Sequence, residues 1–294
     1  MAVDAPGLLW FVRVAWLALP FTLLEHLEEA TAGADRAVWI TTQVLFWVLW
    51  AVAFGVSLVP LPSTLTALRI LVPLAPAASI AAAAVQAPGP GGWIGLAAGT
   101  LAAVAAYSAP VGDWFVDGAS YGDERRFALR APVALLLGPV PLTWVLTVGP
   151  VLAGALLLAG GAWALGGILA AVGLVTAWWG SLALWRLARR WAVFVPAGLT
   201  LVDDMALAEP VLLPATDVTR VGPAHVGTTA RDLTVGAPGL VIEIALSAPL
   251  ELVPAAGADR TTEAVAVHGV LVVPSRPGTL LAHAEERGVP VARD

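Results

Sequence analysis

The charged residues that could do chemistry together lie in one polar segment, residues 110–131, between two long apolar stretches. The candidate ligand-binding side chains of this loop are those of Asp117, Tyr121, Asp123, Glu124, Arg125 and Arg126. Two adjacent guanidiniums can grip a phosphate headgroup through paired hydrogen bonds, and the carboxylates could hold a hydrated divalent cation beside it. Such a site would suit a lipid phosphate or a polyprenyl phosphate.

A structural interpretation of the same loop is nevertheless favoured. The acids follow none of the spaced ligand patterns of a dedicated site. They can instead pair with the neighbouring arginines, while the loop docks on the C-terminal part of the chain. A membrane enzyme that uses these acids with a divalent metal is a weaker alternative.

The sequence indicates no catalytic residue, no metal site and no cofactor. Cysteine is absent, and the four histidines form neither an HxxxH nor an HExxH spacing. No phosphate-binding glycine loop and no serine-nucleophile motif occurs. A non-enzymatic role is therefore favoured.

The composition is that of a membrane protein. Of 294 residues, 59% are hydrophobic and 12% charged, and the mean hydropathy is +0.85, which is too apolar for an ordinary soluble chain. Six apolar stretches predict transmembrane helices at residues 8–24, 38–59, 65–85, 93–109, 132–158 and 161–187. Pro73 and Pro76 should kink the third of these helices. Gly95 and Gly99 form a GxxxG pair, whose favoured role is close packing within the chain.

The arginines predict the topology. Six spans place both termini on one side of the membrane, and only Arg36 falls on the other side. Eight arginines fall on the side of the termini: Arg13, Arg69, Arg125, Arg126, Arg130, Arg186, Arg189 and Arg190. Positive charge is retained on the cytoplasmic side, so a plasma (inner) membrane location with cytoplasmic N- and C-termini is expected. Arg13 and Arg69 lie near the cytoplasmic ends of their spans, where snorkelling suffices.

The last predicted span ends in the segment WRLARRWAVF, residues 185–194. Aromatic and basic residues are typical of a membrane–water interface, and the predicted interface anchors are Trp185, Arg186, Arg189, Arg190 and Trp191. The charge balance changes here: residues 1–190 contain nine acids and nine arginines, whereas residues 191–294 contain twelve acids and six arginines. This acidic tail argues against a nucleic-acid partner and predicts a protein partner with a basic surface.

Beyond Arg190 the hydrophobic period becomes that of short strands. WAVFV and LTLV flank the turn 196–198 and predict a β-hairpin. Further strands are expected at residues 210–214, 217–221, 231–237, 240–247, 250–254 and 264–273. A helix at Thr279–Arg287, ended by Gly288, should follow. The expected fold is thus an α-helical membrane bundle of about six transmembrane helices (1–190), followed by a small mainly-β cytoplasmic domain (191–294), a barrel or sandwich with a C-terminal helix.

The layout of residues 191–288 resembles the pleckstrin-homology-like (PH-like) domains that bacterial membrane proteins carry. Four segments, DGASYGDERR (117–126), RRWAVFVPAGL (189–199), DDMALAEPVL (203–212) and SRPGTLLAHAEERG (275–288), look similar to segments of a family of uncharacterised multi-pass membrane proteins of actinobacteria. This resemblance implies a location and a type of host. It brings no activity and no catalytic residue.

The expected function is that of a membrane anchor or scaffold. The helices would contact membrane lipids and could form a homo-oligomer, while the acidic domain presents a surface to a cytoplasmic partner. The alternative is a transporter, or a protein that handles lipid or polyprenyl phosphates, with its site at the 110–131 loop.

Overall fold

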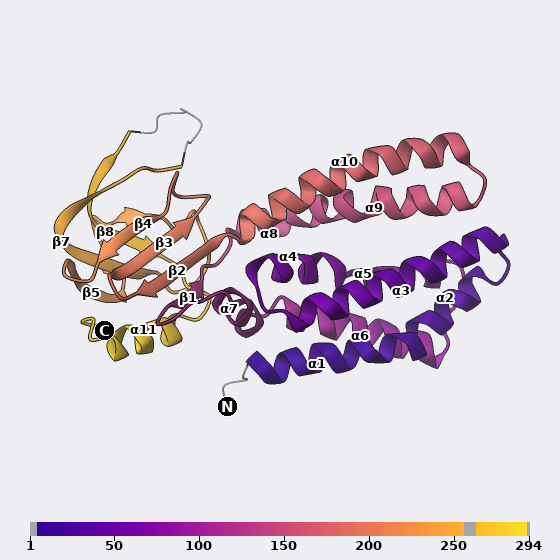
Figure 1. The fold of residues 1–294 in the computed structure, drawn as a ribbon, viewed down its shortest axis with the longest axis horizontal. Coiled ribbons are helices and arrows are strands. Elements are labelled where there is room, and N and C mark those ends of the chain that lie inside the picture. The colour runs from indigo at the N-terminus through magenta and orange to yellow at the C-terminus, as the bar shows by residue number, and fades with distance from the viewer. Residues whose placement is uncertain (1–4, 256–262, 293–294) are drawn as a thin grey trace. The chain divides into compact units, whose positions relative to one another are not determined.

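The computed structural model describes residues 5–255 and 263–292 and divides the chain into two compact units. The helical unit comprises residues 1–115 and 141–184, and the β-rich unit comprises residues 116–140 and 185–294 (Figure 1). This division differs from a single boundary at residue 190 in two segments, residues 116–140 and 185–190. The first supplies strand β1 (Arg125–Ala128), and the second ends in Arg190, the first residue of strand β2 (Arg190–Val195). The chain therefore passes between the units three times, after residues 115, 140 and 184.

Within the described residues, five helical segments are long and apolar enough to cross a membrane. They are α1 (Ala5–Ala18) with η1 (Leu19–Phe21) and α2 (Leu23–Thr31); α3 (Arg36–Leu58); α4 (Pro62–Leu71) with α5 (Leu74–Ala83); α9 (Pro139–Ala159); and α10 (Trp163–Ala188). The helices α6 (Pro90–Ala106) and α7 (Ala109–Asp117) meet at 58° and make a sixth span if both belong to one bent segment. These helices support a multi-pass membrane protein.

Prolines mark the breaks in two of these segments. Pro20 lies in η1, between α1 and α2, and Pro73 lies between α4 and α5. A proline lacks a backbone N–H donor and clashes with the preceding helical turn, so the helix is interrupted there. The break at Pro73 confirms the kink predicted for the third span. Pro76, by contrast, is accommodated inside α5.

The predicted fifth and sixth spans are separate helices joined by a defined turn. The fifth begins later than residue 132, because α8 (Val133–Leu137) is a short helix of its own and Gly138 interrupts the helical backbone. At the other end of α9, Gly161 adopts a φ of 80°. The Ala162 N–H donates to the Leu157 carbonyl at 2.9 Å, as in a Schellman motif. The turn between α9 and α10 therefore depends on the left-handed backbone conformation of Gly161, although the hydropathy of the sequence hardly changes there.

Small residues bring the helices of the helical unit into close contact. A Cβ atom added to Gly95 would lie 2.9 Å from the Leu23 backbone nitrogen of α2, and one added to Gly99 would lie 3.0 Å from Ala75 Cβ of α5. The GxxxG pair therefore packs within the chain, as expected. Between α9 and α10 the same holds at Gly154 and Gly173, where an added Cβ would lie 2.5 Å from Ala170 N and 2.6 Å from Val151 N. Close backbone approach is how membrane helices associate.

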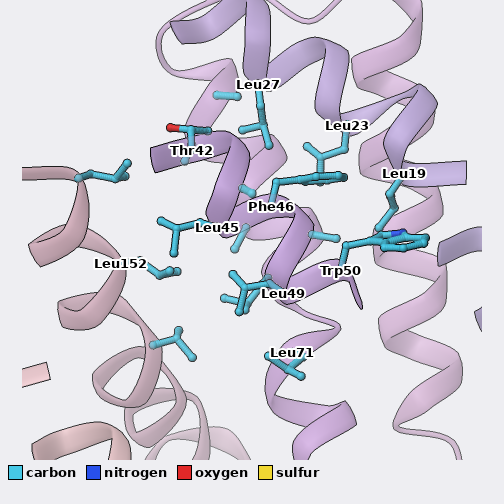
Figure 2. A pocket seen from close by; sticks show the side chains of 18 of the residues that line it. Leu19, Leu23, Leu27, Thr42, Leu45, Phe46, Leu49, Trp50, Leu71 and Leu152 are labelled. Atoms are coloured by element: carbon cyan, nitrogen blue, oxygen red, sulfur yellow. The ribbon is translucent and has the colours of Figure 1, made fainter. Parts of the chain in front are cut away.

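The helical unit also contains an apolar cavity of about 490 Å³. Residues of α2, α3, α5 and α9 line most of it. Figure 2 shows Leu23, Phe46 and Leu152 among the side chains that form the lining.

The β-rich unit contains two four-stranded sheets. The first has the order β1 (Arg125–Ala128), β2 (Arg190–Val195), β3 (Gly198–Asp203) and β4 (Val211–Pro214), all antiparallel. The second has the order β5 (Val218–Pro223), β7 (Ile242–Leu252), β8 (Val265–Val272) and β6 (Arg231–Asp232), in which only β6 pairs in parallel. The predicted hairpin at 191–202 is confirmed as β2–β3. The strands predicted at 240–247 and 250–254 form one strand, β7, whose register shifts between Ala245 and Leu250.

Both sheets and α11 (Pro277–Glu286) contribute to a single hydrophobic core. Ile242 and Ile244 are fully buried while Glu243 between them is partly exposed, which confirms the alternation expected of a half-buried strand. Leu280 and Leu281 of α11 are buried in the same core. Gly288, with a φ of 73°, ends this helix as predicted.

Candidate functional site

The loop that holds the predicted ligand residues is built from the end of α7, a tight turn and β1. The Ser120 N–H donates to the Asp117 carbonyl at 2.8 Å, and the Glu124 N–H donates to the Tyr121 carbonyl at 3.1 Å. Gly122 adopts a φ of 59°, which a glycine reaches without steric cost. The chain then enters β1, which pairs with β2 along its length. The loop is thus held to the β-rich unit by a sheet ladder.

Asp117 organises this turn. Its Oδ1 accepts hydrogen bonds from the Ser120 hydroxyl and the Arg126 backbone N–H, both at 2.9 Å. Its Oδ2 lies 3.1 Å from Arg125 Nη1. The carboxylate therefore closes the turn and neutralises one arginine at the same time.

The second acid–arginine pair joins Glu124 and Arg126, with Oε2 and Nη2 3.3 Å apart. The Asp123 carbonyl, rather than its carboxylate, is contacted by the guanidinium of Arg287 from the end of α11. One polar atom differs from this pattern: Arg126 Nε is buried and makes no hydrogen bond. The loop's charges are thus satisfied largely within the chain.

The segment that follows β1 joins the two sheets. The Leu129 N–H donates to the Arg190 carbonyl at 2.9 Å, and the Arg130 N–H donates to the Val273 carbonyl at 2.8 Å. The loop therefore docks on the C-terminal part of the chain, as the structural interpretation expects. Three of the predicted ligand residues, Tyr121, Asp123 and Arg125, are exposed: Tyr121 is 83% exposed and the Arg125 side chain 50% exposed. Ligand binding by these six residues stays a prediction.

The five predicted interface anchors have different surroundings. Trp185 and Arg186 belong to the last turn of α10, where Arg186 is exposed. The Arg189 guanidinium lies 4.8 Å from the centre of the Trp185 ring and 3.5 Å from an oxygen of Asp204. Arg190 and Trp191, in contrast, open strand β2 and are buried, with exposed fractions of 2% and 9%. They cannot present charge or an indole to lipid headgroups, because the sheet begins one residue earlier than the sequence suggests.

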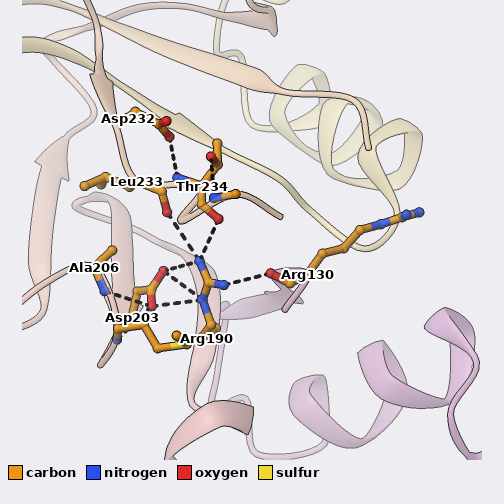
Figure 3. A network of polar contacts seen from close by, with 9 residues as sticks. Arg130, Arg190, Asp203, Ala206, Asp232, Leu233 and Thr234 are labelled. Carbon is orange, nitrogen blue, oxygen red and sulfur yellow. Dashed lines mark hydrogen bonds and ion pairs between the residues drawn. The ribbon is translucent and has the colours of Figure 1, made fainter. Parts of the chain in front are cut away.

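Arg190 is instead the centre of a buried polar network in the β-rich unit (Figure 3). Its Nε donates to Asp203 Oδ1 at 2.9 Å and its Nη2 donates to Asp203 Oδ2 at 2.8 Å, a two-pronged pairing that matches the planar guanidinium. The remaining donors reach the carbonyls of Arg130, Leu233 and Thr234. A buried charge is tolerated when it is paired in this way. The network joins β2, β3, the segment after β1 and the loop after β6.

This pair could have been found from the hairpin alone. Residues 196–197 form the turn between β2 and β3, so Val195 pairs with Gly198 and the register runs back to Arg190 opposite Asp203. An arginine and an aspartate at directly opposed positions of a predicted hairpin are a cross-strand ion pair. The competing signal was the run of arginines after a hydrophobic helix, which indicates an interface.

A second contact that the sequence does not reveal involves His283 of α11. Its ring lies 5.2 Å from that of Phe194 and 5.7 Å from that of Phe127. Its Nδ1 lies 3.1 Å from a carboxylate oxygen of Glu286. His283 therefore packs α11 on β1 and β2, and its role here is structural.

Two arginines of the helical unit, Arg13 and Arg69, bind backbone carbonyls. Arg13 Nη2 donates to the Ser57 carbonyl at 2.6 Å, near the end of α3. Arg69 Nε donates to the Ala106 carbonyl at 3.2 Å, at the end of α6. The last carbonyls of a helix lack partners in their own helix and carry partial negative charge, so a guanidinium is favourable there. Both side chains thus have a capping role in addition to any snorkelling.

No cluster of three or more His, Cys, Asp or Glu residues that could hold a metal ion occurs within residues 5–255 and 263–292. Comparison of the chain with protein-family models, with curated proteins and with solved structures gives no match.

Proposed function

We propose that this protein is a multi-pass anchor or scaffold of the plasma membrane, whose β-rich unit presents an acidic surface to a cytoplasmic protein with a basic surface. The observation that carries this proposal is the way the β-rich unit uses its charges. Arginines 189, 190 and 220 are paired with Asp204, Asp203 and Glu243. Acids such as Glu209 and Glu251 are exposed. With twelve acids against six arginines in residues 191–294, internal pairing leaves the surface negative.

The β-rich unit is proposed to be a PH-like domain. Two mainly antiparallel sheets around one core, with a C-terminal helix packed against it, support this assignment. The cytoplasmic location of this unit and of both termini rests on the eight-to-one distribution of arginines that follows when α6 and α7 together make the sixth span. The resemblance of four segments to actinobacterial membrane proteins supports an actinobacterial plasma membrane as the site. Homo-oligomers through the helical unit are part of the same proposal.

The test is capture of cytosolic proteins by the full-length protein in mild detergent, at low and at high salt. We expect a stoichiometric partner with a basic surface at low salt, and its release as the salt concentration rises, because exposed charges are screened within about 10 Å at 0.1 M salt. The matched variants are Glu209→Lys with Glu251→Lys, which reverse exposed charge, and Glu209→Gln with Glu251→Gln, which only remove it.

Binding should fall in the order wild type, glutamine variant, lysine variant. If no cytosolic protein binds the full chain at low salt, the scaffold proposal is wrong. If a partner binds equally to all three proteins, the acidic surface is not what it recognises.

A second candidate function is the handling of a lipid phosphate or polyprenyl phosphate at the 110–131 loop, by a transporter or a lipid-handling protein. The observation that favours it is Arg126, whose buried Nε has no hydrogen-bond partner. A bound phosphate would supply an acceptor to Arg126 Nε, whereas Arg125, the preceding residue of β1, points to the opposite face of the strand. Native mass spectrometry of the gently extracted protein should then show a phosphate-bearing lipid that is lost in Arg126→Ala. Retention of the lipid in this variant would exclude this site.

A further inference from the structure

We propose that the cavity of the helical unit is a binding site for one acyl chain of a membrane phospholipid. The proposal is independent of the scaffold function, because it concerns only α1–α5 and α9 and none of the acidic residues of the β-rich unit. It rests on the length of the cavity, on its volume and on the state of every polar group in its wall.

The cavity is elongated. Its lining runs from Leu71 to Val85 along the third helical segment, and from Trp144 to Leu156 along α9. At 1.5 Å per helical residue these stretches correspond to about 21 Å and about 18 Å. An apolar space of about 490 Å³ that follows the helices over this length suits an extended hydrocarbon chain.

The wall offers a ligand no hydrogen-bond donor. Its two hydroxyl groups are used within their own helices: Thr31 Oγ1 donates to the Leu27 carbonyl at 2.7 Å and Thr42 Oγ1 donates to the Val38 carbonyl at 3.0 Å. All other lining residues apart from three tryptophans have side chains without a polar group, or no side chain.

The three indoles of the wall are also satisfied by the backbone. Trp16 Nε1 and Trp50 Nε1 donate to each other's carbonyls at 3.0 and 2.9 Å, which ties α1 to α3. Trp144 Nε1 donates to the Ile70 carbonyl at 2.8 Å, which ties α9 to α4. A polar ligand would lose its hydrogen bonds to water and gain none here, which costs several kcal/mol, roughly 2–7. An apolar chain makes no hydrogen bonds to water and therefore loses none on entering the cavity.

A phospholipid is the source of the chain that these features favour. The candidate membrane-spanning helices place the cavity among acyl chains. A phospholipid can keep its headgroup at the membrane surface and insert only hydrocarbon into a wall that offers no donors, and it is the source of acyl chains that the surrounding bilayer itself supplies. Each methylene group of the bound acyl chain would exchange van der Waals contacts with mobile lipid tails for contacts with the packed side chains of the helices.

The experiment compares two glycine variants of the full-length protein. Gly149 lines the cavity, and the nearest atom to a Cβ added there is Val145 Cγ1 at 3.9 Å, so Gly149→Leu should fill the space without a backbone clash. Gly167 of α10 has no atom within 4 Å of an added Cβ and does not line the cavity, so Gly167→Leu is the matched control. Ala78→Phe fills the same cavity from α5 and replaces Gly149→Leu if that variant does not fold.

Each protein is transferred to a delipidating detergent, and bound mass is read by native mass spectrometry, with helical content checked by circular dichroism. We expect one diacyl phospholipid on the wild type and on Gly167→Leu, and occupancy at least about tenfold lower in Gly149→Leu, equivalent to 1.4 kcal/mol. A phospholipid with a photoreactive acyl chain should label α5 and α9 in the wild type. Absence of retained phospholipid on the wild type, or equal retention in Gly149→Leu, overturns the proposal.

Discussion

The helical unit leaves many of its large apolar side chains exposed, whereas the β-rich unit buries most of its own. In the helical unit, glycines at contact points bring backbones together, and large residues such as Trp178 and Ile168 of α10 are 72% and 62% exposed. In the β-rich unit, Leu201 and Ile242 are fully buried. The difference follows from the solvent that each unit faces. In water, the hydrophobic effect drives apolar side chains into the core. In lipid, which is as apolar as leucine, this driving force between helices is absent, and close packing of small residues holds the helices together.

The arginines of the two units show the same contrast. Arg190 of the β-rich unit is balanced by the carboxylate of Asp203. Arg69 of the helical unit donates to the Ala106 carbonyl at the end of α6 and lies 5.4 Å from the Tyr107 ring. A water-facing unit thus uses charge to fix a strand register, and the helical unit uses it to cap a broken helix. Each of the following variants should affect one unit and not the other.

The largest effect is expected from Asp203→Ala. Arg190 would then remain buried without its carboxylate, and loss of one partner of a buried ion pair costs about 3–5 kcal/mol. Hydrogen exchange of the full chain in detergent should show amides of β2 and β3 opening about 10² to 4 × 10³ times more often, since each tenfold change is 1.4 kcal/mol. Amides of α9 and α10 should keep their protection.

The double variant Arg190→Met with Asp203→Leu is the control for this effect. It removes both charges and fills the space with apolar atoms, so it should recover most of the lost protection. If Asp203→Ala changed exchange in β2 by less than about tenfold, the pair would not be what stabilises the hairpin. If the double variant were as unstable as the single one, the hydrogen bonds to the carbonyls of Arg130, Leu233 and Thr234 would carry the stability instead.

An intermediate effect is expected from Gly173→Ala in α10. The added Cβ would lie 2.6 Å from the Val151 backbone nitrogen, so α9 and α10 must move apart. Overpacking of this kind costs about 1–3 kcal/mol. The midpoint temperature of thermal unfolding in detergent should therefore fall, while the protection of β2 and β3 stays unchanged.

Gly167→Ala provides the comparison on the same helix. Nothing lies within 4 Å of its added Cβ, and alanine is a better helix former than glycine by about 0.5–1 kcal/mol. This variant should unfold at the same or a higher temperature than the wild type. Equal destabilisation by both substitutions would mean that α9 and α10 do not pack through the side of α10 that carries Gly173.

The sequence predicts those parts of this molecule that depend on local patterns. Apolar length locates the helices, Pro73 locates a break, and the alternation around Glu243 locates a buried strand. The β2–β3 hairpin follows from a turn between two strand-like runs. The 231–237 strand, by contrast, shortens to Arg231–Asp232, because the chain turns directly after it: the Thr234 N–H donates to Asp232 Oδ1 at 2.7 Å, and Val235 adopts a φ of 53°.

Features that depend on distant partners were not predictable in the same way. The segment 125–128 carries two arginines and reads as part of a polar loop, and only the presence of β2, more than 60 residues later, makes it a strand. The same long-range pairing explains Arg190, whose neighbours in sequence resemble a membrane boundary and whose neighbours in space are strands. Tertiary context overrides a local signal when an unpaired sheet edge is available to the segment.

The smallest effect is expected from Arg125→Ala, which tests how much the charges of the 110–131 loop contribute to stability. The Arg125 side chain is half exposed and its pairing with Asp117 is screened by solvent, so its removal should cost less than about 1 kcal/mol. Asp117→Ala should cost more, about 1–3 kcal/mol, because it also leaves the Arg126 N–H and the Ser120 hydroxyl without their acceptor. Hydrogen exchange of β1 measures both. An Arg125→Ala variant that lost as much protection as Asp117→Ala would show that the accessible guanidinium is a structural element of the β-rich unit, and that the two units differ less in their use of arginine than their contacts indicate.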